Sequence, residues 1–350
     1  MAKSLYIHIP FCKKFCAYCD FVKCIYNKQT VDKYIDLVLK KLDNKKYQTI
    51  YLGGGTPNCL SDEQLEKLLK PLSKHLDKNY EFTIECNPEF VTDSQTKIFY
   101  KYKINRVSLG VQTLDLNLLK TMNRVNHKFM VETAISKFSK NKITNISCDL
   151  IYGFKGQTNE SIKNDINFLI ANKVKHLSLY SLEIKENTAW GGQGYKTNDE
   201  QIEDHLKFAI DYLKQVGFSR YEVSNWAKSS KYQSKHNVAV WKTNDWKAIG
   251  LGAHGMENKT LYHYEGSTLN WKLIKEKLSD FDLYYQVMIM GLRLKEGLDL
   301  SNPLHKKAYN YFKKRIDRDL LIKKNKKHIW CSNVNLLDNF LIKLNEYEKK

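Results

Sequence analysis

The sequence predicts an α/β fold, an open partial (β/α)6 barrel of the TIM type, followed by a small, mainly helical C-terminal domain. Three observations lead to this prediction. Strand-like and helix-like segments alternate six times, which is typical of right-handed βαβ units. The strand-like segments are near-continuous apolar runs, as in sheets covered by helices. Polar and glycine residues follow the strand ends, where the active-site rim of a parallel barrel lies, and six units are fewer than a closed barrel needs.

The expected strands are rich in β-branched and aromatic residues. They cover residues 3–9, 49–52, 81–88, 106–112, 145–153 and 176–182. The expected helices show an apolar face at helical spacing or a capping signature at their start. They cover residues 29–44, a helix opened by the Ser61 capping box, a helix capped by Thr92, and residues 115–122, 128–140, 160–172 and 198–216. Pro71 is expected to kink or end its helix.

The alternation stops after residue 217, which predicts three parts of the chain. Residues 1–217 form the partial barrel, and residues 218–271 form an extension that closes it. This extension contains the sequences His-Asn, at 236–237, and Gly-Leu-Gly-Ala-His-Gly, at 250–255. Residues 272–350 form the small C-terminal domain, in which residues 320–322 and 328–330 are expected to pair as a hairpin.

Composition excludes several classes of protein. No apolar run reaches the roughly 18 residues of a membrane span, and the first ten residues do not have the pattern of a secretory signal. The eight cysteines lack a paired pattern, which favours a reducing cytoplasm over a disulfide framework. The net charge of +19 comes from lysines spread along nearly every segment. Such spreading is typical of solvated helix faces, so we expect no nucleic-acid partner.

Cys12, Cys16 and Cys19 follow the first strand with the spacing C-x3-C-x2-C. Thiolates this close together suit an iron–sulfur cluster or zinc. Three ligands on a four-iron cluster leave one iron open to a substrate or cofactor. Zinc would need a fourth ligand, for which His8 and Cys24 are near enough in sequence. The spacing favours the cluster and keeps zinc as the alternative.

The stretch from Tyr6 to Phe21, YIHIPFCKKFCAYCDF, resembles the cluster motif of the radical SAM superfamily. Its lead-in and its C-x-Y-C-D-F exit are similar to the oxygen-independent coproporphyrinogen oxidase group, and within it to the HemW-type haem chaperones. The similarity extends to about Gly297. It implies that the three cysteines hold a [4Fe-4S] cluster whose open iron binds S-adenosylmethionine. It also implies a reductant such as flavodoxin or ferredoxin.

The glycine run at residues 53–55, followed by Thr-Pro, comes directly after a strand. Consecutive glycines let the backbone approach a ligand closely, although on their own they more often mark a tight turn. Carboxylates at strand ends can accept hydrogen bonds from ribose, and an arginine can fork onto a carboxylate. The resemblance places these roles around S-adenosylmethionine, at Tyr6, Tyr18, Gly54, Gly55, Thr56, Glu85, Gln112, Arg124 and Asp149.

His236 and Asn237 begin the segment H-N-V-A-V-W. In the HemW group the similar H-N-x-x-Y-W segment is associated with haem, and histidine is a common haem ligand. Val240 replaces the tyrosine here, so a hydrogen-bonded His–Asn pair that closes the barrel is an equal alternative. Lys155 and Lys185 also depart from the group's pattern, at positions away from the cluster and the proposed cofactor contacts.

Three functions are therefore considered. The first is a haem chaperone that binds the cluster, S-adenosylmethionine and haem, and delivers haem to acceptor proteins of respiration, membrane-associated ones included. The second is a radical SAM oxidoreductase of the coproporphyrinogen type. The third is a cysteine-metal module for nucleic acid. Phe21 stands where the oxidase has an additional cysteine, and few residues precede the first strand, which favours the chaperone. The sequence leaves open whether radical chemistry occurs.

Overall fold

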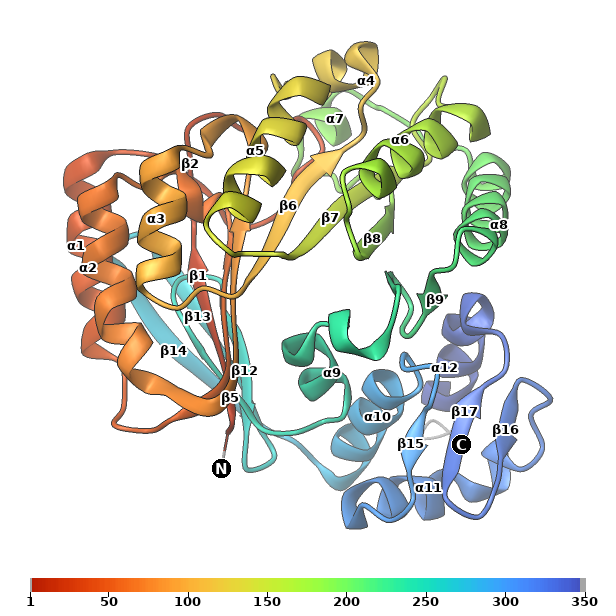
Figure 1. Ribbon diagram of the computed structural model, residues 1–350. Coiled ribbons are helices and arrows are strands. Elements are labelled where there is room, and N and C mark those ends of the chain that lie inside the picture. Colours follow the sequence, from red (N-terminus) through yellow and green to blue (C-terminus); the bar gives the residue numbers. More distant parts are fainter. Residues whose placement is uncertain (1, 347–350) are drawn as a thin grey trace.

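The computed structural model describes residues 2–346, and a curved sheet of twelve strands organises it (Figure 1). Six neighbouring strands are parallel and follow one another in chain order. They are β1 (Ser4–Ile9), β4 (Tyr47–Gly54), β5 (Leu76–Cys86), β6 (Arg106–Gln112), β7 (Asn145–Tyr152) and β8 (His176–Ser181). This arrangement confirms the predicted partial barrel.

Helices cover the outer face of these strands (Figure 1). The covering helices are α1 (Lys28–Lys40), α2 (Asp62–Leu72), α3 (Asp93–Lys101), α5 (Lys128–Lys140), α6 (Asn159–Ala171) and α8 (Asp199–Gln215). Their apolar faces and the outward side chains of the strands form one large core. Capping boxes at Ser61 and Thr158 begin α2 and α6. Pro71 lies in the last turn of α2, which ends one residue later.

The inner face of the sheet is polar, which differs from the predicted apolar runs. On β1, Leu5, Ile7 and Ile9 belong to the helix-side core, and the alternate residues Tyr6 and His8 point the other way. The same alternation leaves polar side chains on the inner face of the other strands, at Thr49, Tyr51, Thr83, Glu85, Ser108, Asp149, His176 and Tyr180. This face is therefore suited to bind a polar ligand.

Residues 218–277 extend the sheet at both edges. Beyond β8 lie β10 (Asn225–Ala227) and β9 (Ser219–Arg220), both antiparallel to their neighbours. Beyond β1 lies the parallel strand β11 (Trp246–Ile249). An antiparallel meander follows it, consisting of β12 (His254–Glu257), β13 (Thr260–Ser267) and β14 (Asn270–Lys277). The division predicted at residue 271 falls inside β14, and the three-part domain organisation stays a prediction.

Several short elements connect these strands and helices. A two-stranded sheet next to the cysteine loop pairs β2 (Phe11–Cys12) with β3 (Cys24–Ile25). The short helices are α4 (Leu116–Thr121), α7 (Ala189–Gly192) and α9 (Lys235–Trp241). The 3-10 turns are η1 (Pro57–Cys59), η2 (Ser73–His75), η3 (Pro88–Phe90), η4 (Ser230–Tyr232) and η5 (Val334–Leu336). Helix α9 contacts β1 and β4, on the inner side of the barrel.

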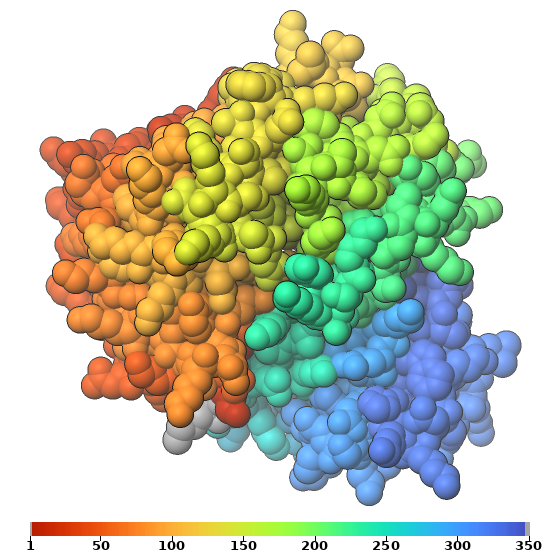
Figure 2. Space-filling model, in the orientation of Figure 1, coloured from red at the N-terminus to blue at the C-terminus, as the bar shows by residue number. Residues whose placement is uncertain are grey.

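The C-terminal residues form a block with its own core, seen at the lower right of the space-filling view (Figure 2). Its helices are α10 (Asp280–Gly291), α11 (Pro303–Ile316) and α12 (Leu337–Asn345). Its small sheet has the order β15 (Leu298–Asp299), β17 (His328–Cys331), β16 (Ile322–Lys324), and β16 and β17 form the predicted hairpin. Within residues 2–346, no helix is both long enough and apolar enough to cross a membrane.

Candidate functional site: a cysteine loop at the barrel rim

Cys12, Cys16 and Cys19 line one cavity of about 350 Å³ at the carboxyl ends of the parallel strands. The same cavity is lined by eight of the nine residues predicted to bind S-adenosylmethionine, namely Tyr18, Gly54, Gly55, Thr56, Glu85, Gln112, Arg124 and Asp149. All eight cysteines are free thiols in the part of the chain that the structure describes. The structure therefore brings these residues together from five strand–helix units, and their roles stay predictions.

Tyr6 is the one of these nine predicted residues that does not line the cavity. The hydroxyl of Tyr6 forms a 3.0 Å hydrogen bond with His8 Nδ1, and its ring lies 6.0 Å from the ring of Tyr51. Burial raises the pKa of Tyr6 well above its ordinary value, and the nearby Glu85 carboxylate adds to the effect. Among the described residues, Tyr6 thus lies beside the cavity wall and does not form part of it.

Hydrogen bonds from two separate segments hold the cysteine loop. The backbone N–H of Ala17 donates to Met122 O at 3.1 Å, directly after α4. Asn123 Nδ2 donates to Phe15 O at 2.8 Å, and Trp190 N in α7 donates to Ala17 O at 3.0 Å. The loop is therefore fixed by residues that lie more than a hundred positions further along the chain.

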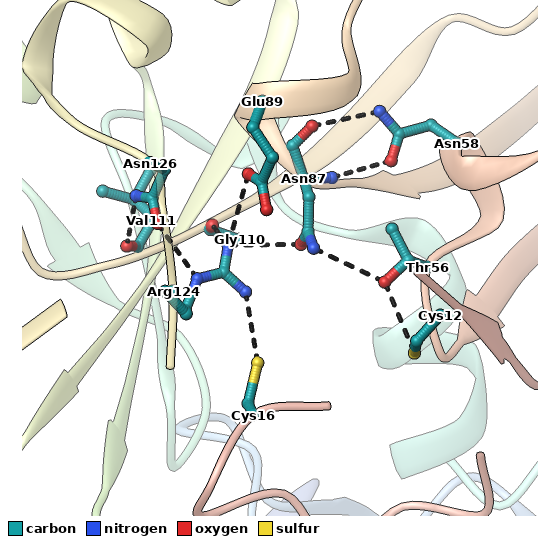
Figure 3. A network of polar contacts seen from close by, with 10 residues as sticks. All are labelled: Cys12, Cys16, Thr56, Asn58, Asn87, Glu89, Gly110, Val111, Arg124 and Asn126. Carbon is teal, nitrogen blue, oxygen red and sulfur yellow. Dashed lines mark hydrogen bonds and ion pairs between the residues drawn. The ribbon is translucent and has the colours of Figure 1, made fainter. Parts of the chain in front are cut away.

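Two cysteine sulfurs accept hydrogen bonds, and Figure 3 shows that one network joins them. Thr56 Oγ1 donates to Cys12 Sγ at 3.6 Å, and Arg124 Nη1 donates to Cys16 Sγ at 3.8 Å. Asn87 connects the two donors, because its Nδ2 donates to Thr56 Oγ1 at 3.4 Å and its Oδ1 accepts from Arg124 Nη2 at 3.3 Å. Donors directed at sulfur are what a thiolate ligand needs.

The thiols have the chemistry of metal ligands. Burial raises the pKa of Cys12 to about 11, against the hydrogen bond from Thr56, and burial also raises the pKa of Cys19. A coordinated metal removes the proton from such a thiol outright. Within residues 2–346, no three His, Cys, Asp or Glu side chains converge on one point, as a single zinc ion requires. Cysteines of a four-iron cluster bind separate irons, so the three residues fit the cluster better than zinc.

The glycine segment at the end of β4 brings the backbone close to Cys12. Gly54 has a φ of +118°, which favours glycine, and a side chain there would lie 2.8 Å from the ring of His8. A side chain at Gly55 would lie 2.8 Å from Phe11 O and 2.9 Å from Cys12 Sγ. Both positions therefore require glycine, and their peptide groups line the cavity.

Two carboxylates at strand ends face the cavity. Glu85 accepts hydrogen bonds from Tyr51 Oη at 2.7 Å and from Gly54 N at 3.0 Å. Burial raises the pKa of Glu85 to about 7, and the Asp149 carboxylate adds to the rise, while the two hydrogen bonds oppose it. Both oxygens of Asp149 accept from Ser108 Oγ at 3.1 Å, and burial raises its pKa too. A bound ligand with a positive charge would keep both groups ionised.

Gln112 and Arg124 come from the end of β6 and from the segment after α4. The pairing of β6 with β7 shifts register between Gly110 and Gln112, and Gln112 has a φ of 68°. Such bulges occur next to active sites because they redirect a side chain. Arg124 Nη2 donates to Gly110 O at 2.7 Å, and Nε donates to Asn126 Oδ1 at 3.0 Å. The guanidinium is thus held in one orientation at the cavity wall.

Some residues that line or support the cavity were not assigned a role from the sequence. Asn87 stands at the centre of the network, and Asn58 fixes it by exchanging two hydrogen bonds with its backbone, at 2.8 and 3.0 Å. Tyr51 and Ser108 position the two carboxylates. Tyr51 and Ser108 lie on strands and Asn87 directly follows one, and the alternation of polar residues along each strand is the signal that could have identified them.

His236 and Asn237 lie in α9, away from the cysteine loop. The ring of His236 is buried, its Nδ1 forms a 2.9 Å hydrogen bond with Thr49 Oγ1, and it lies 5.1 Å from the ring of Tyr51. Burial lowers its pKa to about 3, so the ring is neutral at pH 7. Among the described residues, neither His236 nor Asn237 lines the cavity. Their predicted contact with haem stays a prediction.

The sequence matches the radical SAM superfamily over residues 6–169. Coproporphyrinogen III oxidase (HemN) from Escherichia coli shares the fold, with a TM-score of 0.82 and 20% identity, over 98% of this chain and 90% of that one. Fold and cysteine site together define a radical SAM protein, and this class implies a [4Fe-4S] cluster and S-adenosylmethionine.

Several relatives carry the name "Heme chaperone HemW". The protein of Lactococcus lactis subsp. lactis (strain IL1403) is 35% identical over 313 residues, which cover 84% of this chain and 82% of the relative. The protein of Bacillus subtilis (strain 168) is 34% identical over 268 residues, which cover 72% of this chain and 70% of the relative. The chain belongs to the HemW family of the radical SAM superfamily.

Proposed function

We propose that this protein is a haem chaperone, which holds a [4Fe-4S] cluster and S-adenosylmethionine, binds haem and passes it to acceptor proteins. One observation carries the proposal. The three cysteines line a single cavity together with Glu85 and Arg124, in a chain whose relatives are named haem chaperones. Acceptors of respiration, membrane-associated ones included, and a reductant such as flavodoxin or ferredoxin are the proposed partners. Eight free thiols suit a reducing cytoplasm as the compartment.

The cavity residues divide into groups by the part of the ligand that they suit. Cys12, Cys16 and Cys19 would hold the cluster, and the hydrogen bonds from Thr56 and Arg124 would stabilise the negative charge on sulfur. When bound together, the cluster and S-adenosylmethionine supply one-electron chemistry. The remaining polar groups of this wall would orient S-adenosylmethionine and exclude water from it.

Each polar group matches one part of S-adenosylmethionine. The peptide groups of Gly54 and Gly55, with Glu85, suit the amino group, and a fork-shaped guanidinium at Arg124 suits the carboxylate. Asp149 can accept hydrogen bonds from the ribose hydroxyls, and Gln112 can accept or donate them. Tyr18 lines the cavity, and Tyr6 lies beside it, so both can flank the adenosyl group.

Anaerobic reconstitution with iron and sulfide tests the cluster. We expect about four irons per chain and a brown chromophore. Cys16→Ala should lose the chromophore, while Cys331→Ala should keep it, because Cys331 belongs to the separate C-terminal core. Stoichiometric zinc without uptake of iron would contradict the proposal and favour the metal module that the sequence left as an alternative.

The second candidate is an oxidoreductase of the coproporphyrinogen type, favoured by the fold shared with coproporphyrinogen III oxidase. Parallel measurements separate the two functions. Saturable haem binding without decarboxylation of coproporphyrinogen supports the chaperone, and turnover supports the oxidoreductase. Both assays use the same reconstituted protein, so a difference between them does not depend on how much cluster is loaded.

A further inference from the structure

Two histidines lie opposite one another on the sheet extension. His254 of β12 pairs in register with His263 of β13. Their rings are stacked, with centroids 5.2 Å apart and planes inclined by 19°. His254 is exposed, and the side chain of His263 is 38% exposed. Two accessible imidazoles side by side are a metal-binding arrangement, because imidazole is the commonest protein ligand for transition metals.

The pair lies on the continuation of the inner face of the barrel. Met256 and Leu261 stand two residues from His254 and His263, so they share the same face of their strands. Met256 and Leu261 pack in one cluster with side chains of α9, the helix on the inner side of the barrel. His8 belongs to that inner face. Burial lowers the pKa of His8, and the nearby His254 adds a smaller effect in the same direction.

Four other histidines are less suited to a large ligand. The two ring nitrogens of His8, of His176 and of His305 all form hydrogen bonds. His236 is buried, with one ring nitrogen bonded to Thr49. Among the described residues, no hydrogen bond occupies a ring nitrogen of His254.

The surroundings suit a flat apolar ligand that carries negative charge. Phe21 and Val22 are 63% and 43% exposed. A side chain at Gly252 would lie 2.8 Å from Val22, so this apolar segment adjoins the loop that leads to His254. Ile274 pairs directly with His263, and Lys272 stands two residues away on the same face of β14. Glu265 lies between them, 3.4 Å from Lys272 Nζ and 3.6 Å from His263 Nε2, and Lys272 would have to exchange this exposed carboxylate for one of the ligand. A porphyrin ring could cover the apolar side chains, with its carboxylates toward lysine.

We propose that haem binds on this inner face of the β12–β14 meander, with His254 as an axial ligand of the iron and His263 as a positioning residue. This inference rests on the proposed haem-chaperone function and names the site within it. Stacked rings 5.2 Å apart cannot coordinate from opposite sides of a porphyrin. One protein ligand therefore holds the iron, and the opposite side of the ring stays open to a ligand from the acceptor.

Titration of the full chain with ferric haem, followed by the Soret band, tests the site. We expect saturable binding by the wild-type protein, loss of the ligated spectrum in His254→Ala, and about tenfold weaker binding in His263→Ala. His254→Cys distinguishes direct ligation from a structural role, because a thiolate ligand changes the spectrum itself. His328→Ala, in the C-terminal block, is the matched control and should bind haem like the wild type.

The possible results separate this inference from the function on which it rests. If the wild-type protein binds no haem, both the chaperone function and the inference fail. If it binds haem and His254→Ala binds it unchanged, while His236→Ala loses the spectrum, the inference fails and the chaperone function stands. An unaltered spectrum in His254→Cys would also overturn the role of His254 as ligand.

Discussion

Arg124 is the residue on which the geometry of the cluster site depends most. Its guanidinium bonds to Gly110 O, Asn126 and Asn87 and reaches Cys16, although its side chain is only 4% exposed. Glu89 Oε2 lies 3.8 Å behind it and forms no other hydrogen bond within the described chain. A buried cation with one carboxylate neighbour stays charged, so it can compensate anionic sulfur.

Arg124→Lys should destabilise the protein, because an ammonium group cannot replace the planar fork. It leaves the Gly110 carbonyl or the Asn126 amide without its donor, and each buried polar group left unpaired costs about 1–3 kcal/mol. We expect a loss of about 3 kcal/mol in the free energy of unfolding, measured in urea. The exposed Arg318→Lys is the control. Equal unfolding midpoints for the two variants would contradict this account.

Glu85 predicts a pH dependence of stability. Its pKa is about 7 in the folded protein, against an ordinary value of 4.5, so the folded state binds the proton more tightly than the unfolded state. The stabilisation is complete below pH 4.5 and is lost as the pH rises through 7. Between pH 5 and 8, the free energy of unfolding of the protein without cofactors should fall by up to about 3 kcal/mol on this account.

Glu85→Gln removes this ionisable group and should flatten the pH profile of the unfolding free energy. Glu132→Gln changes an exposed glutamate of α5 and should leave the profile as in the wild type. Chemical denaturation at each pH gives the comparison. A profile of Glu85→Gln as steep as that of the wild type would show that another group causes the slope.

The sequence predicted the residues whose position follows from strand order. Cys12, Glu85 and Asp149 come at or after strand ends, and the ends of parallel strands meet at one edge of the sheet. Asn87 and Tyr51 were not assigned a role, because their contribution depends on which neighbours they meet across the sheet. These neighbours are more than thirty positions away in the sequence, and the spacing of residues along one strand does not identify them.

Sequence signals that lie within a single helix or strand predicted that element well. The capping box at Ser61, for example, predicted the start of α2 to the residue. The edge strands β9 to β14 were not predicted as parts of the sheet, because they are short or antiparallel and do not repeat the strand–helix unit. Their placement depends on the sheet edges that the first 181 residues create.

Ser61→Ala should destabilise α2. The Ser61 hydroxyl accepts a hydrogen bond from Gln64 N at 3.3 Å, and the Gln64 side chain accepts one from Ser61 N at 3.1 Å. Removing an N-cap costs about 1 kcal/mol. Thermal unfolding should show a lower Tm than the wild type. Ser139→Ala, at an exposed position near the end of α5, should not lower the Tm, and an equal loss in both variants would exclude the cap as the cause.

Gly55→Ala should impair loading of the cluster. The added methyl group would lie 2.8 Å from Phe11 O and 2.9 Å from Cys12 Sγ, so the first cysteine would have to move. We expect fewer irons per chain after anaerobic reconstitution. In Gly192→Ala the methyl group meets no atom within 4 Å, and the iron content should match that of the wild type. Full iron loading in Gly55→Ala would show that the loop adapts.

The whole molecule contains a large core around the sheet and a separate core in the C-terminal block. The second core is formed by α10, α11, α12 and the small sheet, and Ile329 is fully buried in it. An antiparallel bridge between Glu222 and Leu294 joins the block to the rest of the chain. Met290 of α10 also packs against Trp246 and Met256 of the extended sheet, but each core has its own set of buried side chains and can open separately.

Ile329→Ala should therefore destabilise the C-terminal block more than the barrel. Truncating a buried isoleucine costs about 2–5 kcal/mol. Hydrogen exchange should become faster at the amides of residues 280–345 and stay unchanged in the parallel strands. Ile342→Ala, at a side chain that is 59% exposed, is the matched control. Faster exchange throughout the barrel in Ile329→Ala would mean that the two cores unfold as one unit.

The attachments of the cysteine loop also set an order of events during synthesis. The three thiols leave the ribosome with the first few residues, but the backbone groups that fix their loop belong to Met122 and Trp190. Thr56 and Arg124 follow earlier, but the last of these attachments is made only when more than half of the polypeptide has emerged. We therefore expect the metal to be loaded after residue 190 has been synthesised, because a shorter nascent chain would present an incompletely held loop of thiols to oxidants.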